Sequence, residues 1–265
     1  MKYDDIVIES LVQFLDWVMK NGRIKTYYRG QSSREWNLTP SVFRRNYSEH
    51  NILNRAEILL WKELSIYTKY LDKLIFLQHY GLPTRLLDVT FNPLVAIYMA
   101  CEYSKEEYTD DGAIYWGVKC SDQTPLAAEL IAKYIFTEQY VMSSDDIDSF
   151  AKRNHIPTKD LCSACFIIPP IANPRLEQQL GAFVMAPYSK KDYSPFHANC
   201  SLDSYNLFDK NRLIIPKEKK KQILKELATI GINRASLFVD ITSKLFSIKR
   251  EEEWRIDDIE KIQLS

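Results

Sequence analysis

QHYGLPTRLLDVTFNPLVAIY, residues 78–98, holds more information about the fold than any other part of this sequence. Apolar residues at helical spacing precede it over residues 52–77, and the Gly-Leu-Pro run at 81–83 ends that helix. Asn92-Pro93 then opens a second helix, because proline suits the first helical turn. The stretch therefore predicts two helices joined by a polar connection.

The connection, residues 84–92, mixes charged and polar side chains with rigid turn residues. Loops that hold such groups against a scaffold are often functional. A structural role has equal support: Thr90 or Asn92 caps the following helix, and Asp88 pairs with Arg85. The residues alone leave both interpretations open.

Short apolar or aromatic runs elsewhere in the chain predict β-strands. They lie at residues 25–30, 113–118, 166–168, 181–185 and 212–215. Helices are predicted at 5–20 and 217–228, and a helix-rich surface insertion at about 123–160. Residues 236–240 suit either a strand or the start of a helix.

These elements indicate an α+β fold in a single domain, with small mixed or antiparallel sheets flanked by helices. We divide the chain into an N-terminal helix at 1–22, the main domain at 23–248 with its insertion, and a charged C-terminal tail at 249–265. The tail is predicted to be a solvated helix end.

Composition narrows the classes of function. The 35 Lys and Arg balance 35 Asp and Glu, which argues against a charge-driven nucleic-acid binder. No run approaches the roughly 18 apolar residues of a membrane span. Seven scattered glycines exclude P-loop and dinucleotide fingerprints. Five cysteines and no signal-peptide core indicate a cytoplasmic protein without a disulfide framework.

Four residues have the types of a zinc site, Cys162, Cys165, His197 and Cys200. The second half has an atypical spacing, and Cys165 runs directly into an apolar strand. Buried thiols are the better interpretation. No metal is therefore expected.

Two places combine polar groups with strand ends. In residues 28–31, YRGQ, Arg29 can grip a phosphate or carboxylate through two N–H groups, and the glycine permits close approach of another backbone. An exposed arginine at a strand end is the structural alternative. Before the strand at 181–185, Glu177 and Gln179 either project into a cleft or lie on a surface loop.

Together, YRG at 28–30 and QHYGLPTRLLD at 78–88 strongly resemble the FRG domain, a bacterial family named for its (F/Y)RG signature. The segments at 175–183 and 227–240 fit the same pattern. The resemblance spans about residues 24–245 and implies that the main domain is an FRG domain.

The sequence departs from the family pattern at two positions. Val89 stands where the family tends to have Trp, and Val239 stands where Pro is usual. Both look like packing positions, so neither changes the assignment.

The order of the motifs is also similar to that of ADP-ribosyltransferases. In those enzymes an early strand ends in Arg or His before a small residue, a Ser or Thr precedes a Tyr-containing helix, and a catalytic Glu begins a later strand. Arg29 matches the first element, Thr90 and Tyr98 match the second, and Gln179 stands where the Glu is expected. The resemblance implies an ADP-ribosyltransferase-like core with a helical insertion, NAD as substrate, and Arg29, Thr90 and Gln179 as catalytic residues.

Loss of nicotinamide from NAD leaves positive charge on the ribose, so the site must clamp the diphosphate and hold both ends of the reacting bond. The resemblance implies that Arg29 binds the diphosphate and that Gln179 forms a hydrogen bond with the ribose 2′-hydroxyl. Tyr80 or Tyr98 would stack on the nicotinamide. The remaining candidates for cofactor binding are Tyr28, Gly30, Gln31, His79, Arg85, Asp88 and Asn92.

An amide cannot stabilise positive charge as a carboxylate does, so Glu138 and Glu177 are candidates for the missing carboxylate. The expected acceptor is a macromolecule, RNA, DNA or protein. The basic runs at 44–45 and 217–221 would guide a phosphate backbone or simply form solvated helix faces. Such an enzyme would act as a toxin or phage-defence effector, with an antitoxin or regulatory protein as a further candidate partner.

A different class of function is a non-catalytic FRG domain that binds a nucleotide or nucleic acid in the same cleft. Gln179 in the Glu position favours it. A nuclease or hydrolase has only His79 in its favour. Both main hypotheses require one cavity to gather the motif residues, namely Arg29, Thr90, Tyr98 and Gln179.

Overall fold

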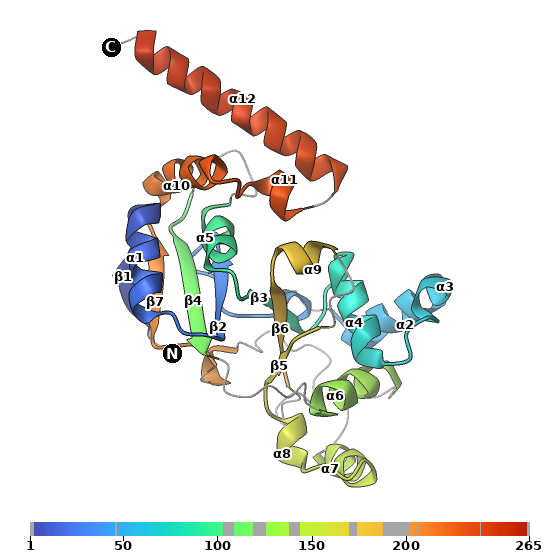
Figure 1. Ribbon diagram of the computed structural model, residues 1–265. Helices are drawn as coiled ribbons and strands as arrows, with labels where there is room; N and C mark the ends of the chain where they lie inside the picture. Colours follow the sequence, from blue (N-terminus) through green and yellow to red (C-terminus); the bar gives the residue numbers. More distant parts are fainter. Residues whose placement is uncertain are drawn as a thin grey trace.

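The computed structural model describes residues 3–45, 47–102, 109–118, 126–137, 144–169, 174–187, 202–205, 207–238 and 240–263. Within them, seven strands form one mixed sheet in the order β1-β7-β4-β2-β3-β6-β5 (Figure 1). The strands are β1 (Asp4–Val7), β2 (Thr26–Gln31), β3 (Leu86–Thr90), β4 (Gly112–Val118), β5 (Cys165–Ile167), β6 (Gly181–Met185) and β7 (Asn211–Ile215). β1 and β7 are parallel, and the other neighbours are antiparallel. The α+β prediction is confirmed, with one large sheet in place of several small ones.

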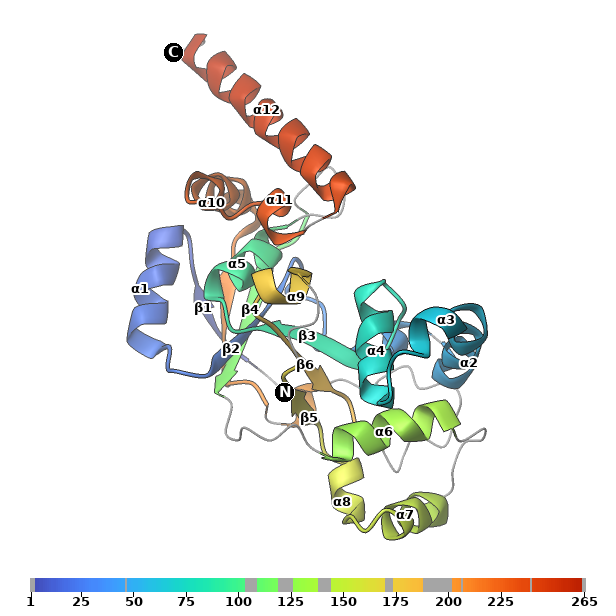
Figure 2. The same ribbon diagram turned by 45° about the vertical axis from the view of Figure 1, so that its right-hand side comes forward.

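Helices pack around this sheet in two groups (Figures 1 and 2). The first group lies by β2, β4 and β7 and comprises α1 (Leu11–Asn21), α5 (Pro93–Cys101), α10 (Lys217–Thr229) and α11 (Arg234–Leu237). The second lies toward β5 and β6 and comprises α2 (Glu49–Leu59), α3 (Trp61–Leu64), α4 (Tyr70–His79), α6 (Leu126–Thr137), α7 (Ser144–Arg153) and α8 (Thr158–Leu161). The remaining helices are η1 (Ser41–Arg44), α9 (Pro174–Gln178), η2 (Leu202–Tyr205) and α12 (Ile241–Gln263), which projects from the body in both views. In the described part of the chain, no helix has the length and apolar character needed to cross a bilayer.

Residues 86–90 form the central strand β3, so the prediction of a polar loop was wrong here. β3 pairs with β6 along its whole length, from Leu86↔Met185 to Thr90↔Gly181. Leu86, Leu87 and Val89 are buried, because both faces of a central strand are covered. The capping alternative is confirmed at Asn92, whose side chain accepts a hydrogen bond from the Leu94 backbone N–H at 2.9 Å.

The N-terminal segment is not helical from residue 5. Residues 4–7 form the edge strand β1 beside β7, and the helix begins only at Leu11. Ser10 marks this boundary, since its hydroxyl accepts a hydrogen bond from the backbone N–H of Gln13. Residues within 1–22 therefore belong to the same sheet as the main domain.

The structure also corrects the predictions for two helical regions, residues 52–77 and the insertion at 123–160. The pattern over 52–77 is divided among α2, α3 and α4, with breaks after Leu59 and Leu64. Of the insertion at 123–160, the structure describes 126–137 and 144–160, and these residues are helix-rich as expected. α6 is nevertheless a core helix, because most of its apolar side chains are buried against α2, α4 and β5.

α5 lies unusually close to β2. A Cβ atom added to Gly30 would meet the Ala96 carbonyl oxygen at 1.9 Å and the Ala100 backbone nitrogen at 2.8 Å. Only glycine allows this approach. The glycine of the YRG motif therefore sets the distance between the strand and the helix that follows β3.

Candidate functional site

β2 and β3 separate soon after they meet. β2 pairs with β4 over six residues but with β3 only at Tyr28↔Thr90. At this opening lies a cavity of about 880 Å³, bounded by α5 and by the C-terminal helices α11 and α12. Its lining comes from β2 and the loop after it (Tyr28, Arg29, Gly30, Gln31, Ser32, Trp36), from β3 (Asp88, Val89, Thr90), from α5 and its end (Val95, Ala96, Met99, Glu102), from Gln179, and from α11 and α12 with their link (Arg234, Phe238, Phe246, Lys249, Arg250, Glu253).

Arg29 sits at the end of the β2–β3 pairing and is half-buried. Its Nη1 donates to the backbone carbonyl of Asp88 at 2.7 Å, and its Nε donates to Oε1 of Gln31 at 3.1 Å. Burial lowers the pKa of Arg29 to about 10, against the opposing effect of Asp88, while Arg44 lowers it further. The guanidinium thus bridges the two strands, keeps its charge at neutral pH and retains unused N–H groups.

Thr90 and Gln179 meet on the other side of the opening. The Thr90 hydroxyl donates to the backbone carbonyl of Gln179 and accepts from the backbone N–H of Asn92. The Gln179 side-chain Nε2 donates to the carbonyl of Leu237 at 3.0 Å. These bonds fix the backbone before β6 to β3 and to α11, and they leave Oε1 of Gln179 as an acceptor.

Asp88 and Arg85 do not pair, which corrects that structural alternative. The Asp88 carboxylate accepts from Nε2 of Gln78 at 3.3 and 3.4 Å and is exposed at the cavity. Arg85 is buried outside the cavity, where its Nε lies 3.1 and 3.0 Å from the Glu49 carboxylate oxygens and its Nη1 donates to Ala186. These contacts give Arg85 a structural role.

Four further candidates lie outside the cavity lining. His79 and Tyr80 end α4, where their rings contact each other and Tyr80 is exposed. Asn92 caps α5. Tyr98 is 1% exposed, and burial, together with the negative charge of nearby Glu102, raises the pKa of its hydroxyl. The structure therefore separates Tyr98 and Tyr80 from Arg29, and neither ring is placed to stack on a ligand beside it.

The C-terminal helix contributes a wall that the sequence did not reveal. Arg250 is 5% exposed and donates to Oε1 of Glu102 at 2.5 Å, and Arg234 lies 3.7 Å from the same oxygen. Both guanidinium groups also lie over the Phe246 ring, with the guanidinium carbon of Arg234 at 5.0 Å and that of Arg250 at 4.5 Å from the ring centroid. We call Glu102, Arg234, Phe246 and Arg250 the Glu102 cluster; it joins α5, α11 and α12. The prediction of a purely solvated tail was wrong at Arg250.

The two glutamates considered from the sequence as the missing carboxylate do not appear in the described cavity lining. Glu177 is exposed and does not line the cavity, and Glu138 lies outside the described residues. The described lining holds Asp88, Glu102 and Glu253 instead. A helix-end glutamate with an arginine-rich partner helix is a weak sequence signal, so Glu102 could not be chosen in advance.

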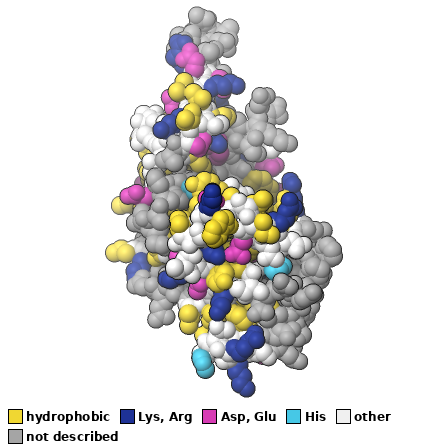
Figure 3. All heavy atoms as spheres, turned by 90° about the vertical axis from the view of Figure 1, so that its right-hand side faces the viewer, with side chains coloured by type: hydrophobic (Ala, Val, Ile, Leu, Met, Phe, Trp, Pro, Cys, Tyr) yellow, Lys and Arg dark blue, Asp and Glu magenta, His cyan; other side chains and the backbone are white. Residues whose placement is uncertain are grey.

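On one face of the molecule, basic side chains occupy scattered positions (Figure 3). In Figure 3 they are scattered among acidic and apolar side chains and do not form a continuous strip. Within the run at 217–221, Lys220 is 2% exposed and donates to the backbone carbonyl of Ser32 at 2.6 Å. Arg44 is tied to the Thr39 carbonyl at 2.8 Å. These contacts give Lys220 a structural role and hold Arg44 near Asp88.

The structure describes two of the four residues of the cysteine pattern, Cys162 and Cys165. Cys162 is partly buried and Cys165 is buried, and burial raises the pKa of the Cys165 thiol to about 12. His197 and Cys200 lie outside the residues that the structure describes. Among the described side chains, no group of three or more His, Cys, Asp or Glu is arranged to hold a metal ion.

Comparison with known proteins gives a family but no relative of known activity. Neither a curated protein nor a solved structure matches the chain. The family described as FRG domain matches residues 24–109, which include β2, β3 and α5. The match thus contains both strands that open to form the cavity, and the chain carries an FRG domain at residues 24–109.

Proposed function

We propose that the cavity binds NAD and that the protein is an ADP-ribosyltransferase-like enzyme that modifies a macromolecule. One observation carries this proposal: Arg29, Thr90 and Gln179, from three distant parts of the chain, line the same cavity. Its volume of about 880 Å³ lies within the roughly 300–1,000 Å³ of small-molecule sites.

Arg29 is the proposed diphosphate clamp. Two of its N–H groups are held by Asp88 and Gln31, so the guanidinium is oriented before a ligand arrives. The remaining N–H groups suit two oxygens of a phosphate. A clamp of this kind fixes the ribose and the leaving nicotinamide relative to the acceptor, which lowers the entropic part of the barrier.

Gln179 and the cavity carboxylates are the proposed partners of the ribose. Oε1 of Gln179 can accept a hydrogen bond from a ribose hydroxyl, because Nε2 is already bound to Leu237. Developing positive charge needs a carboxylate nearby. Glu253 suits this role better than Glu102, since Glu102 is in a buried pair with Arg250 at 2.5 Å, whereas Glu253 makes only an exposed contact with Lys249 at 3.6 Å.

The test is NAD consumption by the purified chain with RNA, DNA and protein offered as acceptors. We expect turnover by the wild type and its loss in Arg29→Ala. Arg55→Ala is the matched control, because this arginine is exposed on α2 and does not line the cavity. Thermal unfolding of both variants checks that the fold persists. No NAD turnover with any acceptor would refute the transferase proposal.

A toxin or phage-defence role follows from the same chemistry, since consuming NAD or modifying a macromolecule harms a cell. Expression in a bacterial host should then slow growth, and Arg29→Ala should relieve the effect. An antitoxin or regulatory protein would be the partner that protects the producing cell.

A recognition domain without catalysis is the second candidate. Two observations favour it: an amide stands where the transferases have Glu, and the Glu102 carboxylate is neutralised by Arg250. Stabilisation by ADP-ribose in a thermal shift, together with the absence of NAD turnover, would support binding alone.

A further inference from the structure

We propose that Trp36 is the residue that stacks on the planar base of a nucleotide whose phosphates are bound by Arg29. The inference rests on the proposed function, because it assigns the base subsite of the same cavity. Trp36 lines the cavity with Arg29 and Gln31 and is 49% exposed. A large aromatic side chain is thus presented on the cavity wall beside the proposed clamp.

Hydrogen bonds connect Trp36 to the clamp through its backbone. Its carbonyl accepts from Nε2 of Gln31 at 2.9 Å and from the Tyr115 hydroxyl at 3.5 Å. Gln31 in turn accepts from Nε of Arg29 through its other side-chain atom, Oε1, at 3.1 Å. One glutamine therefore holds both the tryptophan backbone and the guanidinium, which sets the spacing between them.

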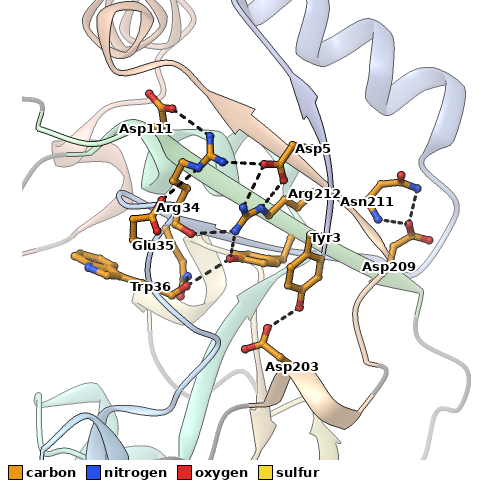
Figure 4. A network of polar contacts seen from close by, with 12 residues as sticks. Tyr3, Asp5, Arg34, Glu35, Trp36, Asp111, Asp203, Asp209, Asn211 and Arg212 are labelled. Carbon is orange, nitrogen blue, oxygen red and sulfur yellow. Dashed lines mark hydrogen bonds and ion pairs between the residues drawn. The ribbon is translucent and has the colours of Figure 1, made fainter. Parts of the chain in front are cut away.

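An ion-pair network fixes the loop that carries Trp36 (Figure 4). The Arg34 backbone N–H donates to the Asp111 carbonyl at 2.7 Å, and its Nη2 lies 3.1 Å from the Asp5 carboxylate. Arg212 donates to the Arg34 carbonyl at 2.9 Å and pairs with Asp5 at 2.7 Å. The loop is therefore held to β1, to β7 and to the residue before β4 at Arg34, two residues before the tryptophan.

The indole itself takes no part in this network. Figure 4 shows it turned away from the Arg34, Asp5 and Arg212 side chains, with only the Trp36 backbone among the dashed contacts. A rigid backbone with a free aromatic ring loses little entropy when a base stacks on it, since only two side-chain torsions remain to be fixed. Trp36 thus offers what Tyr80 and Tyr98, outside the cavity, do not.

Calorimetric titration of the full chain tests the inference with two probes, ADP-ribose and the base-free inorganic pyrophosphate. Stacking between a base and an aromatic side chain contributes about 1–3 kcal/mol, which is roughly a 5- to 150-fold change in Kd. Trp36→Ala should weaken ADP-ribose binding by this factor and leave pyrophosphate binding unchanged. Trp36→Phe should retain most of the affinity.

Trp61→Ala is the matched control, because Trp61 is also exposed, at 65%, but lies on α3 outside the cavity lining. ADP-ribose should quench the tryptophan fluorescence of this control and of the wild type, and the quenching should be lost in Trp36→Ala. This readout reports contact with the indole and would not follow from a purely structural role.

The outcomes separate the inference from the proposed function. Unchanged ADP-ribose binding in Trp36→Ala, with loss in Arg29→Ala, overturns the stacking role alone. Equal weakening of both probes in Trp36→Ala also overturns it, since the residue would then act through the fold. If Trp36→Ala weakens the binding of ADP-ribose but not of pyrophosphate, and the wild type shows no NAD turnover, the stacking role is supported and the transferase proposal is refuted. No binding of ADP-ribose by the wild type overturns both.

Discussion

Replacing Gly30 with alanine tests the packing on which the cavity depends. The added Cβ would stand 1.9 Å from the Ala96 carbonyl oxygen, and the two other close atoms are also backbone atoms of α5. An ordinary carbon–oxygen contact is about 3.3 Å, so helix and strand must separate by about 1.4 Å or the strand must deform. No side-chain rotation relieves the clash.

We expect Gly30→Ala to lower the free energy of unfolding by about 3 kcal/mol, the upper end of ordinary overpacking costs. For a chain of this size the melting temperature should fall by about 6–12 °C. Since Ala96, Met99 and Glu102 line the cavity, ADP-ribose binding should weaken as well. Thermal and urea unfolding measure the first effect, and calorimetry measures the second.

Gly181→Ala is the control from the neighbouring part of the sheet. Its Cβ would meet only the Cδ2 atom of Leu176 within 3.4 Å, and that methyl group can move. A loss of less than about 1 kcal/mol is expected, because alanine also restricts the unfolded chain. If the melting temperature of Gly30→Ala lies within about 2 °C of that of Gly181→Ala, the inference that Gly30 sets a close contact between α5 and β2 is refuted.

Three other predictions concern single residues. Arg85→Ala should cost about 3–5 kcal/mol in urea unfolding, because it leaves the buried Glu49 carboxylate without its partner; a cost below about 1 kcal/mol would contradict the pair. Asn92→Ala should cost about 1 kcal/mol through loss of the helix cap, whereas Asn92→Asp should unfold like the wild type, and equal losses would exclude capping as the cause. Because the pKa of Arg29 is about 10, ADP-ribose affinity should be level from about pH 6 to pH 8 and decline toward pH 10, and a tenfold change below about pH 8 would rule out Arg29 as the titrating group. Between about pH 10 and pH 12.5 the unfolded chain holds the extra proton on this residue, so Arg29 by itself makes stability rise with pH in that window.

Sequence reasoning succeeded where local signals and tertiary environment agree. The aromatic run at 25–30 forms β2, and Asn92-Pro93 begins α5. It failed at β3, because Asp88 and Thr90 gave the segment a polar character while its apolar residues were buried on a covered sheet. It also failed at β1, whose four residues gain their pairing only from β7, far away in the sequence.

The candidate site was predictable in part, and by resemblance more than by pattern. The motif order singled out Arg29, Thr90 and Gln179, which the structure brings to one cavity. Arg250 was missed because a charged residue in a charged helix is ordinarily solvated, and only the position of Glu102 buries it. Trp36 was missed, since a single aromatic residue carries no periodic signal.

The lone β2–β3 pairing makes a seam between four strands on one side and three on the other. Few backbone bonds cross it, so the amides of Arg29 to Gln31 and of Asp88 to Thr90 should exchange with deuterium sooner than those where β2 meets β4. A ligand bound across the seam would contact both parts of the sheet and hold them together. Its binding should therefore slow deuterium exchange at the amides of β2 and of β3 that face the seam, whether or not a reaction follows.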